Sequence, residues 1–590
     1  MRQAWKEVVG LVYALPTVRL FRAFGVKPKG STAEHVGWNI APEYVAYNWN
    51  DVTSTCELLD ATLRSFAQHP IDLEPGAAYS AASIGKAYFC KFGITSPLDR
   101  WPNFPRDVLG IAASSFYGGS TGVAYRRCIV PVKYVDFFSM YSTVNTLLGT
   151  EELLRAADYR IVDCTDDVNE MLATMPRRAA FDRDFWKQLS FFGEVILDGS
   201  GVFPVRSVFE KGDAARIGMC YAQSDEPRWY AGPDVVASYV LSGKRPRVRR
   251  AIRIEPVRDT SGVVVPLASL APVDLLGSLP VNPATDNIFQ RLIVERVRAK
   301  GDAALSKAER DRLNTGLKCI ASATGYGVFA EVNVDDTGEQ REMRVYSGGE
   351  TFDATNDIER AGAFSFMPIA AFTTLAAHLM LALVEREVKR RGGTIAVWDT
   401  DSSAIVATKD GGWIDVIADG GATKHVRALS WHEVEPIVGA FQTFNPYDRS
   451  IVRGSILKIE EINFDSSGAL RDVWMYTVSS KRYCLFEIVD DEPQFIVDES
   501  GKADGVKMSA LGAIVGPVFC DWYDPRTSEP VDAAVPEAKK TVWISRCCNI
   551  IVHRAMGLPD RDTAWLGQHV VGNLKLSSAF VWKQFATINR

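Results

Sequence analysis

The sequence lacks the cysteine patterns of disulfide-rich and zinc-binding proteins. Its ten cysteines are scattered, Cys547 and Cys548 are the only close pair, and no Cys-x-x-Cys or cysteine–histidine spacing suits zinc. The N-terminus also lacks the basic, apolar and small-residue order of a secretory signal peptide. These absences argue against a disulfide framework and predict reduced thiols in a cytoplasmic protein.

An overall excess of positive charge is absent as well. The formal net charge is −6, so a surface for a polyanion would have to be local. One basic segment exists, KRPRVRRAIR at 244–253, which has six basic residues and no acid. It is either a solvated basic loop or a contact to phosphate.

The chain has no clear membrane span, internal repeat or low-complexity tract. The most apolar run, MPIAAFTTLAAHLMLALV at 367–384, contains His378 and two threonines and continues directly into EREVKRR. This composition predicts a buried amphipathic helix, and we expect no membrane partner.

The length of 590 residues and the 47% hydrophobic content predict a globular protein of several subdomains. Helical periodicity covers 42–68, 287–300 and 304–323, and the segment 69–76 (HPIDLEPG) reads as a linker. Other predicted elements are a strand-like run at 129–141, a mixed region at 150–285, a hairpin at 328–350, and alternating strands and helices from 485.

Aspartates interrupt two apolar segments whose remaining residues predict buried strands. Asp399 and Asp401 lie inside IAVWDTDSSAIVA (395–407), and Asp136 lies inside YVDFFSMY. An ionised carboxylate is costly to bury without a counter-ion. Taken alone, DTDS could be an ordinary β-turn. Two apolar strands that each deliver an acid instead predict a two-metal site, with ions about 3.5–4 Å apart.

The two basic helices could neutralise phosphate. Arg296 and Lys300 are four residues apart and share a helix face, and Lys318 lies on the second helix. Such residues usually form a solvated face. Together with the aspartates, they suit a triphosphate clamp around sparsely ligated Mg²⁺.

These segments resemble the motifs of family B DNA polymerases, and they occur in the family's order. The matching segments are DFFSMYS (136–142) and WDTDS (398–402) for the palm, KCIASATGYG (318–327) for the fingers, SFYGGSTG (115–122) for the Tyr-x-Gly-Gly element and KRY (481–483) for the Lys-x-Tyr element. Ser322 replaces the usual fingers asparagine, and Gly325 adds one residue before Tyr326. The long 150–285 region, with FWKQLSFF and WYAGPD, resembles the insertion of a bacterial or mobile-element branch.

The resemblance implies roles for individual residues. Asp136 and Asp401 would ligate two Mg²⁺ ions, or Mn²⁺, and Asp399 would be a supporting, more replaceable catalytic residue. The nucleotide-binding residues would be Ser139, Tyr141, Arg296, Lys300, Lys318 and Tyr326, with Tyr141 excluding a 2′-hydroxyl. The residues touching DNA would be Tyr117, Gly118, Gly119, Gly327, Lys481 and Tyr483.

The resemblance also implies a fold, an α+β multidomain chain shaped as a right hand with an antiparallel-sheet palm. The implied parts are an exonuclease-like remnant (1–75), a linker and palm with the first motif (76–149), an insertion (150–285), fingers (286–325), palm with the second motif (326–484) and thumb (485–590). YNWND (47–51) is similar to the third motif of the family's 3′–5′ exonuclease, but residues 1–50 contain no aspartate. Asp51 is therefore expected to be a remnant in a truncated exonuclease segment.

The leading hypothesis is a template-directed DNA polymerase that extends a primer with dNTPs and does not proofread. One alternative is primer-independent or protein-primed synthesis, and another is a polymerase-like protein that binds DNA without turnover. The expected partners are primer–template DNA and dNTPs, with a separately encoded exonuclease or a priming protein as further candidates.

Overall fold

The computed structural model describes residues 42–78, 80–207, 216–346, 350–418 and 423–497, with shorter stretches between 506 and 572. The first 41 residues of the predicted exonuclease remnant lie outside this range. The chain divides into two compact units. Unit 1 comprises Met1–Gly118, Phe138–Met380 and Gln442–Ile456, and unit 2 comprises Gly119–Phe137, Leu381–Phe441 and Leu457–Arg590. The prediction of a mixed α and β chain with more than one subdomain is confirmed.

Unit 2 is built on an 11-stranded sheet in which all but one of the pairings are antiparallel. Strand β2 (Cys128–Phe137) lies at its centre and pairs with four other strands. The other strands are β1 (Thr121–Val123), β13 (Ile395–Asp399), β14 (Ser402–Thr408), β15 (Gly412–Ala418), β16 (Thr423–Ser430), β17 (Leu457–Ile459), β18 (Val473–Ser479), β19 (Arg482–Val489), β20 (Glu492–Phe495) and β21 (Val506–Met508).

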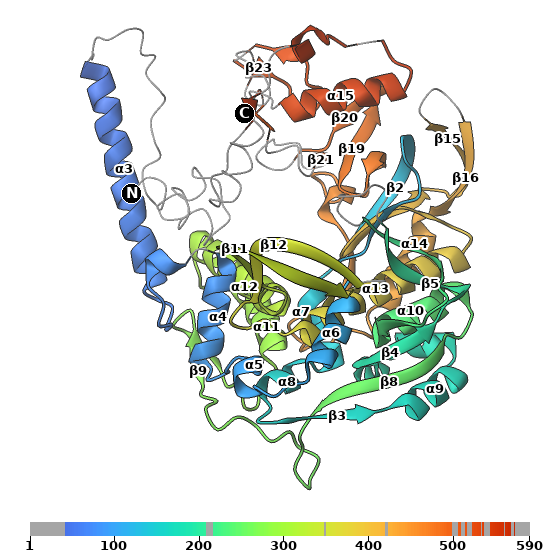
Figure 1. Cartoon of the computed structure of the whole chain (residues 1–590). Helices are drawn as coiled ribbons and strands as arrows, with labels where there is room; N and C mark the ends of the chain where they lie inside the picture. The colour runs from blue at the N-terminus through green and yellow to red at the C-terminus, as the bar shows by residue number, and fades with distance from the viewer. Residues whose placement is uncertain are drawn as a thin grey trace. The chain divides into compact units, whose positions relative to one another are not determined.

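The apolar side chains of these strands form the core of unit 2. Val130, Val132, Val406 and Met475 are at most 1% exposed and belong to one cluster. Valine-rich strands of this kind suit a sheet that is covered on its faces. Helix α14 (Trp431–Ala440) contacts β16, and α15 (Trp543–Ala555) packs on β19 and β20 (Figure 1).

Both strands that carry the aspartates end earlier than the sequence predicts. The run 129–141 is a strand only as far as Phe137, because Ser139 has a positive φ of 50° and a helix begins at Met140. The run 395–407 is not one strand but a hairpin of β13 and β14, which turns at Thr400 and Asp401. The β-turn that the residues of DTDS allowed is therefore present, whereas the turn after Phe137 was not predicted, because the residues that flank it are equally apolar.

Unit 1 contains most of the helices. They are α3 (Pro42–Phe66), α4 (Ala81–Lys91), α5 (Pro97–Arg100), α6 (Arg106–Ser114), α7 (Met140–Leu148), α8 (Glu151–Arg155), α9 (Thr165–Thr174), α10 (Gly232–Ser242), α11 (Ile288–Gly301) and α12 (Lys307–Gly325). The predicted helices at 42–68, 287–300 and 304–323 are confirmed as α3, α11 and α12. Helices α4, α11 and α12 pack together (Figure 1).

The apolar helix and the hairpin before it are also confirmed. The predicted hairpin is longer than 328–350 and consists of β11 (Val332–Tyr346) and β12 (Glu350–Ala361). Helix α13 (Met367–Arg390) is long and apolar enough to cross a membrane by composition, but 94% of its apolar window is buried inside the protein. It therefore has the character of a core helix.

The 150–285 region forms a four-stranded sheet with a separate ribbon. The sheet consists of β3 (Tyr159–Asp163), β8 (Arg247–Pro256), β4 (Phe191–Ile196) and β7 (Arg228–Ala231); the ribbon consists of β5 (Asp198–Ser207) and β6 (Arg216–Gln223); and a small pair consists of β9 (Val273–Leu275) and β10 (Leu279–Val281). Helix α9 packs on β8, and α10 packs on β4, β5 and β7 (Figure 1).

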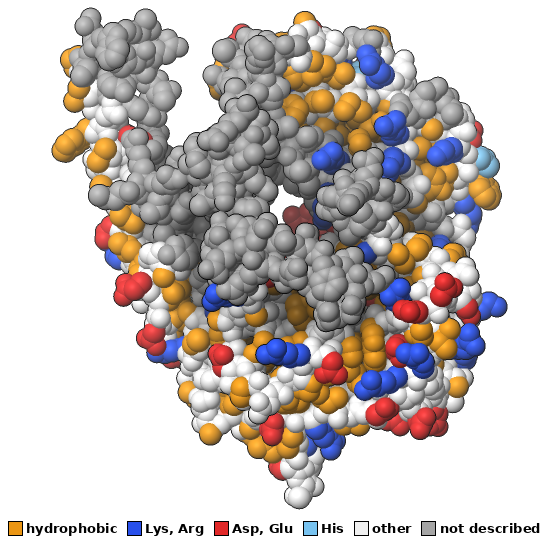
Figure 2. Space-filling view, viewed as in Figure 1, with side chains coloured by type: hydrophobic (Ala, Val, Ile, Leu, Met, Phe, Trp, Pro, Cys, Tyr) orange, Lys and Arg blue, Asp and Glu red, His pale blue; other side chains and the backbone are white. Residues whose placement is uncertain are grey.

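The basic segment 244–253 is largely strand β8 and not a solvated loop. Arg247, Arg249 and Arg253 form ion pairs with acids of the same unit, and Arg250 lies 6.0 Å from the ring centroid of Trp229. Arg247, Arg249 and Arg250 remain exposed on the strand, so a contact to phosphate stays a prediction. In Figure 2, basic and acidic side chains are interspersed over the coloured part of the visible face.

Candidate active site

The pairing register of unit 2 brings the three predicted acidic residues to one end of neighbouring strands. Asp136 on β2 lies opposite Ser402 on β14, and Ser402 also pairs with Asp399 on β13. The backbone amide of Phe137 donates a hydrogen bond of 2.8 Å to the carbonyl of Asp401. Asp136, Asp399 and Asp401 therefore meet where β2 ends and the β13–β14 hairpin turns.

The hairpin turn has an unusual backbone. Thr400 has a φ of 63°, a left-handed conformation that is rare for a β-branched residue. Its amide donates to the carbonyl of Ser120 at 2.8 Å, and a Cβ on Gly119 would lie 2.9 Å from the Thr400 side chain. The Gly119–Ser120 backbone thus holds the turn in place. Strain held by surrounding structure is common at functional sites.

The three carboxylates differ in exposure and in partners. Asp399 is 2% exposed and forms an ion pair with the ammonium of Lys481. Asp136 is half-buried, and Asp401 is exposed. Burial, together with the negative charges of Asp399, Asp136 and Asp401, raises the pKa of Tyr483 to about 12 despite a hydrogen bond from Tyr134 that lowers it. Asp401 and Asp136 are thus the more accessible of the three carboxylates.

A hydroxyl chain lies beside the acids. The Tyr134 hydroxyl is 2.7 Å from the Ser402 hydroxyl and 2.9 Å from that of Tyr483, which links β2, β14 and β19. Sequence reasoning predicted Tyr483 but missed Tyr134 and Ser402. The sequence could have indicated Tyr134, because it is two residues before Asp136 and alternate residues of a strand lie on the same face.

Breaking the Lys481–Asp399 pair is expected to destabilise unit 2. Lys481→Met leaves a buried carboxylate without its cation, at a cost of about 1–3 kcal/mol because Lys481 itself is half-exposed. Lys481→Met with Asp399→Asn removes both charges and should recover most of the loss. Thermal unfolding of the two single variants and the double variant measures the coupling. Additive effects would contradict a functional ion pair.

Two predicted nucleotide-binding residues meet at the start of α7 in unit 1. Ser139 precedes the helix, and Arg296 of α11 donates to its hydroxyl at 3.4 Å. The same guanidinium lies 5.9 Å from the Phe138 ring centroid and donates to Asn314 of α12 at 2.8 Å. Burial lowers the pKa of Arg296. A partly desolvated, fixed guanidinium is suited to binding a phosphate or carboxylate.

The predicted aromatic pair also meets in unit 1. The rings of Tyr141 and Tyr326 lie 5.2 Å apart, and Tyr326 stacks on Phe116 at 6.1 Å. Asn145, fully buried on α7, donates to the carbonyl of Gly325 at 2.7 Å and accepts from Thr373 at 2.7 Å. Asn145 therefore fixes the end of α12 directly before Tyr326, a role that the sequence did not reveal.

The remaining predicted residues lie apart from these contacts. Lys300 and Lys318 are exposed on α11 and α12, and neither has an ion-pair partner among the residues that the structure describes. Gly327 is exposed. Tyr117 is only 8% exposed, because its ring stacks on Tyr230 at 5.8 Å, so a DNA contact at this position would fall mainly to the backbone.

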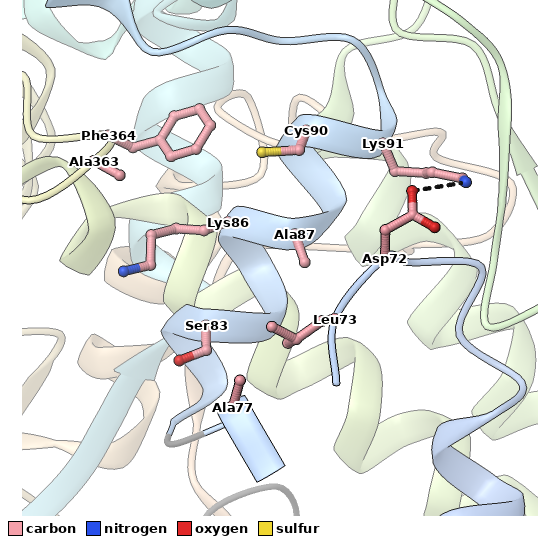
Figure 3. Close-up of a pocket in the computed structure, with 10 residues that line it drawn as sticks. All are labelled: Asp72, Leu73, Ala77, Ser83, Lys86, Ala87, Cys90, Lys91, Ala363 and Phe364. Atoms are coloured by element: carbon pink, nitrogen blue, oxygen red, sulfur yellow. Dashed lines mark hydrogen bonds and ion pairs between the residues drawn. The ribbon is translucent and has the colours of Figure 1, made fainter. Parts of the chain in front are cut away.

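A separate hollow of about 510 Å³ lies beside α4 in unit 1 (Figure 3). Its two lysines are paired, Lys86 with Glu331 at 2.9 Å and Lys91 with Asp72 at 3.3 Å. None of the predicted site residues lines it. The hollow is therefore not a candidate for the active site.

No family model and no curated protein matches the chain. Among solved structures, Phi29 DNA polymerase complexed with primer-template DNA and incoming nucleotide substrates is 14% identical, with a TM-score of 0.43, over 84% of this chain and 69% of that chain. An orthorhombic crystal form of Phi29 DNA polymerase is 14% identical, with a TM-score of 0.44, over 84% of this chain and 70% of that chain. With TM-scores below 0.5, these likenesses assign no activity to the chain.

Proposed function

We propose that this chain is a template-directed DNA polymerase, which adds dNTPs to a primer 3′ end by nucleotidyl transfer with two divalent ions and without proofreading of its own. The observation that supports this most is the meeting of Asp136, Asp399 and Asp401 at the ends of paired strands, with Lys481 beside them. Carboxylates brought to one end of neighbouring strands repel one another, and acidic groups in this situation are more frequent at functional sites than elsewhere.

The residues present fit Mg²⁺ as the proposed cofactor. In the described part of the chain, no group of three or more histidine, cysteine, aspartate or glutamate side chains could hold a metal by itself. Mg²⁺ usually takes one or two carboxylates and completes its shell with substrate phosphates and water. Asp136 and Asp401 supply such a donor set. When bound, the ions would lower the pKa of the primer 3′-hydroxyl and neutralise charge on the phosphates.

The chain's own residues would position the two reactants. Asp136 and Asp401 would hold the ions, and Lys481 neutralises Asp399, so that the carboxylate nearest the core adds no net charge. In unit 1, Arg296 is fixed beside Ser139, where a phosphate could be held. Lys300 and Lys318 would attract the outer phosphates. In the reaction, the 3′-oxygen attacks the α-phosphate and pyrophosphate leaves.

Sugar selection would depend on Tyr141. Its ring contacts the ring of Tyr326, which would restrict its movement away from a 2′-hydroxyl on the nucleotide. Tyr141→Ala is expected to raise the efficiency of ribonucleotide incorporation relative to that of deoxynucleotides by at least about tenfold, because steric exclusion is lost. Single-nucleotide incorporation with matched rNTP and dNTP measures the ratio. Tyr221→Ala, at an exposed tyrosine of β6 in the same unit, is the control.

The function is tested by primer extension with Mg²⁺ and four dNTPs on a defined template. We expect incorporation that follows the template and depends on a primer; incorporation without a primer would favour primer-independent synthesis. With dNTPs omitted, a labelled 3′ end should stay intact, since YNWND (47–51), with Asp51 on α3, is similar to one exonuclease motif and residues 1–50 contain no aspartate. DNA binding without incorporation under Mg²⁺ or Mn²⁺ would favour a non-catalytic binding protein.

A further inference from the structure

A buried acid–histidine pair lies in unit 1. Asp234 is in the first turn of α10, His378 is midway along α13, and Nδ1 of the imidazole is 2.9 Å from Oδ1 of the carboxyl. Their side chains are 0% and 1% exposed. Nε2 of His378 lies 2.9 Å from the carbonyl oxygen of Gly118, in the Tyr-Gly-Gly element.

The partners of His378 fix where its protons are. A carbonyl oxygen can only accept, so Nε2 carries a hydrogen and donates it to Gly118. Nδ1 then either donates to the Asp234 carboxylate or accepts from its carboxylic acid. Both arrangements keep two protons in the pair and satisfy both contacts. Burial raises the pKa of Asp234, and His378 opposes that shift.

Two further groups of the 150–285 region hold the same backbone segment. Tyr230 stacks on the Tyr117 ring with an interplanar angle of 10°. The guanidinium of Arg206 lies 4.2 Å from the Tyr117 ring centroid and donates to the carbonyl of Ser114 at 2.9 Å and to that of Phe116. The segment from Ser114 to Gly118 is thus held by two strands and by α13, with Asp234 of α10 behind His378.

We propose that Asp234 and His378 are positioning residues that, together with Tyr230 and Arg206, clamp the Tyr117–Gly118 backbone for contact with the template strand. The inference rests on the proposed function and gives the 150–285 region a role within it. An apolar pair of similar volume could fill this space, but it would leave the Gly118 carbonyl without its donor, so the pair acts on the backbone of the Tyr-Gly-Gly element. Gly118 has a φ of 71°, a left-handed conformation that favours glycine, so the backbone at this turn is held by its neighbours and not by a side chain of its own.

Two substitutions of His378 each preserve one of its two hydrogen-bond contacts, with Gly118 or with Asp234, and remove the other. The amide nitrogen of His378→Gln reaches the position of Nε2 and can still donate to Gly118, whereas that of His378→Asn reaches only the position of Nδ1 and the Asp234 carboxyl. Hydrogen exchange of the peptide 114–120 is expected to accelerate at least about tenfold in His378→Asn, which loses the contact with Gly118, and by a smaller factor in His378→Gln, which loses only the orienting contact with Asp234. His432→Asn, on an exposed histidine of unit 2, is the matched control.

The affinity for primer–template DNA should also be reduced more in His378→Asn than in His378→Gln. We expect the Kd to rise about tenfold in His378→Asn and little in His378→Gln, with the KM for dNTP unchanged in both. Unchanged exchange at 114–120 in His378→Asn, or equal acceleration throughout unit 1 in both variants, would overturn the clamp. If the wild type neither binds nor extends primed DNA, the proposed function fails, while the exchange result still decides whether the clamp exists.

Discussion

Asparagine at Asp136 or Asp401 is expected to reduce templated incorporation by about a thousandfold or more. Each substitution removes a carboxylate charge that would hold a divalent ion, and such an ion supplies several kcal/mol of transition-state stabilisation. A loss of about 4 kcal/mol corresponds to about a thousandfold in rate. The fold should survive, because removing one of three neighbouring negative charges relieves repulsion. Single-turnover primer extension measures the rate, and thermal unfolding checks the fold.

Asp410→Asn is the matched control, since Asp410 is an exposed aspartate in the turn after β14 of the same unit. It should extend primers at the wild-type rate. The primer-extension rate of Asp399→Asn should lie between that of the control and those of Asp136→Asn and Asp401→Asn. Asp399 is buried against Lys481, so its loss disturbs the position of the turn without removing an accessible carboxylate. Wild-type incorporation by Asp136→Asn or Asp401→Asn would exclude the proposed mechanism.

The elements that the sequence predicted well are those with long and unambiguous periodicity. Helices α11, α12 and α13 follow the predicted ranges because their apolar residues repeat at helical spacing over several turns. The turn at Ser139 was not predicted, and the turn at Thr400 was predicted only as an alternative, from the turn-forming residues of DTDS. Each depends on a left-handed backbone at a residue other than glycine, which is held by long-range contacts such as the amide of Thr400 donating to Ser120. Local backbone propensity does not depend on such contacts, so it cannot predict them.

The three aspartates of the candidate site were found through one physical rule, that charge inside an apolar run needs a partner; the basic residues came from the pattern of two helices, and the other site residues came from the family resemblance. The rule drew attention to Asp136, Asp399 and Asp401, whose functional roles stay predictions. It applies equally to Asp234 and His378, which interrupt apolar runs and are each other's partner. That pairing was missed because 144 residues separate them, and one sequence does not show which distant segments meet. The ion pairs that occupy the arginines of β8 were hidden for the same reason.

Gly122→Ala is expected to lower the primer-extension rate by about a hundredfold and to destabilise unit 2. Gly122 on β1 is directly opposite Trp398 on β13, and a Cβ at this position would lie 2.0 Å from the indole ring. The ring is also held by its Nε1 hydrogen bond to Ser120 at 3.0 Å. Overpacking of this kind costs about 1–3 kcal/mol. Trp398 precedes Asp399 directly, and a displacement of about 1 Å at reacting groups can cost about a hundredfold in rate.

A second substitution tests whether the collision with Trp398 is the cause. Trp398→Phe removes the ring atoms that the new methyl group would meet, so Gly122→Ala with Trp398→Phe should regain much of the rate and of the melting temperature. Gly439→Ala is the control for glycine substitution in unit 2, because no atom lies within 4 Å of its Cβ position and its helical backbone favours alanine. Full activity of Gly122→Ala would show that the β1–β13 pairing does not position the catalytic turn. If Gly122→Ala lowers the rate and the melting temperature equally with and without Trp398→Phe, the cause is the backbone of β1 and not the collision with the indole ring.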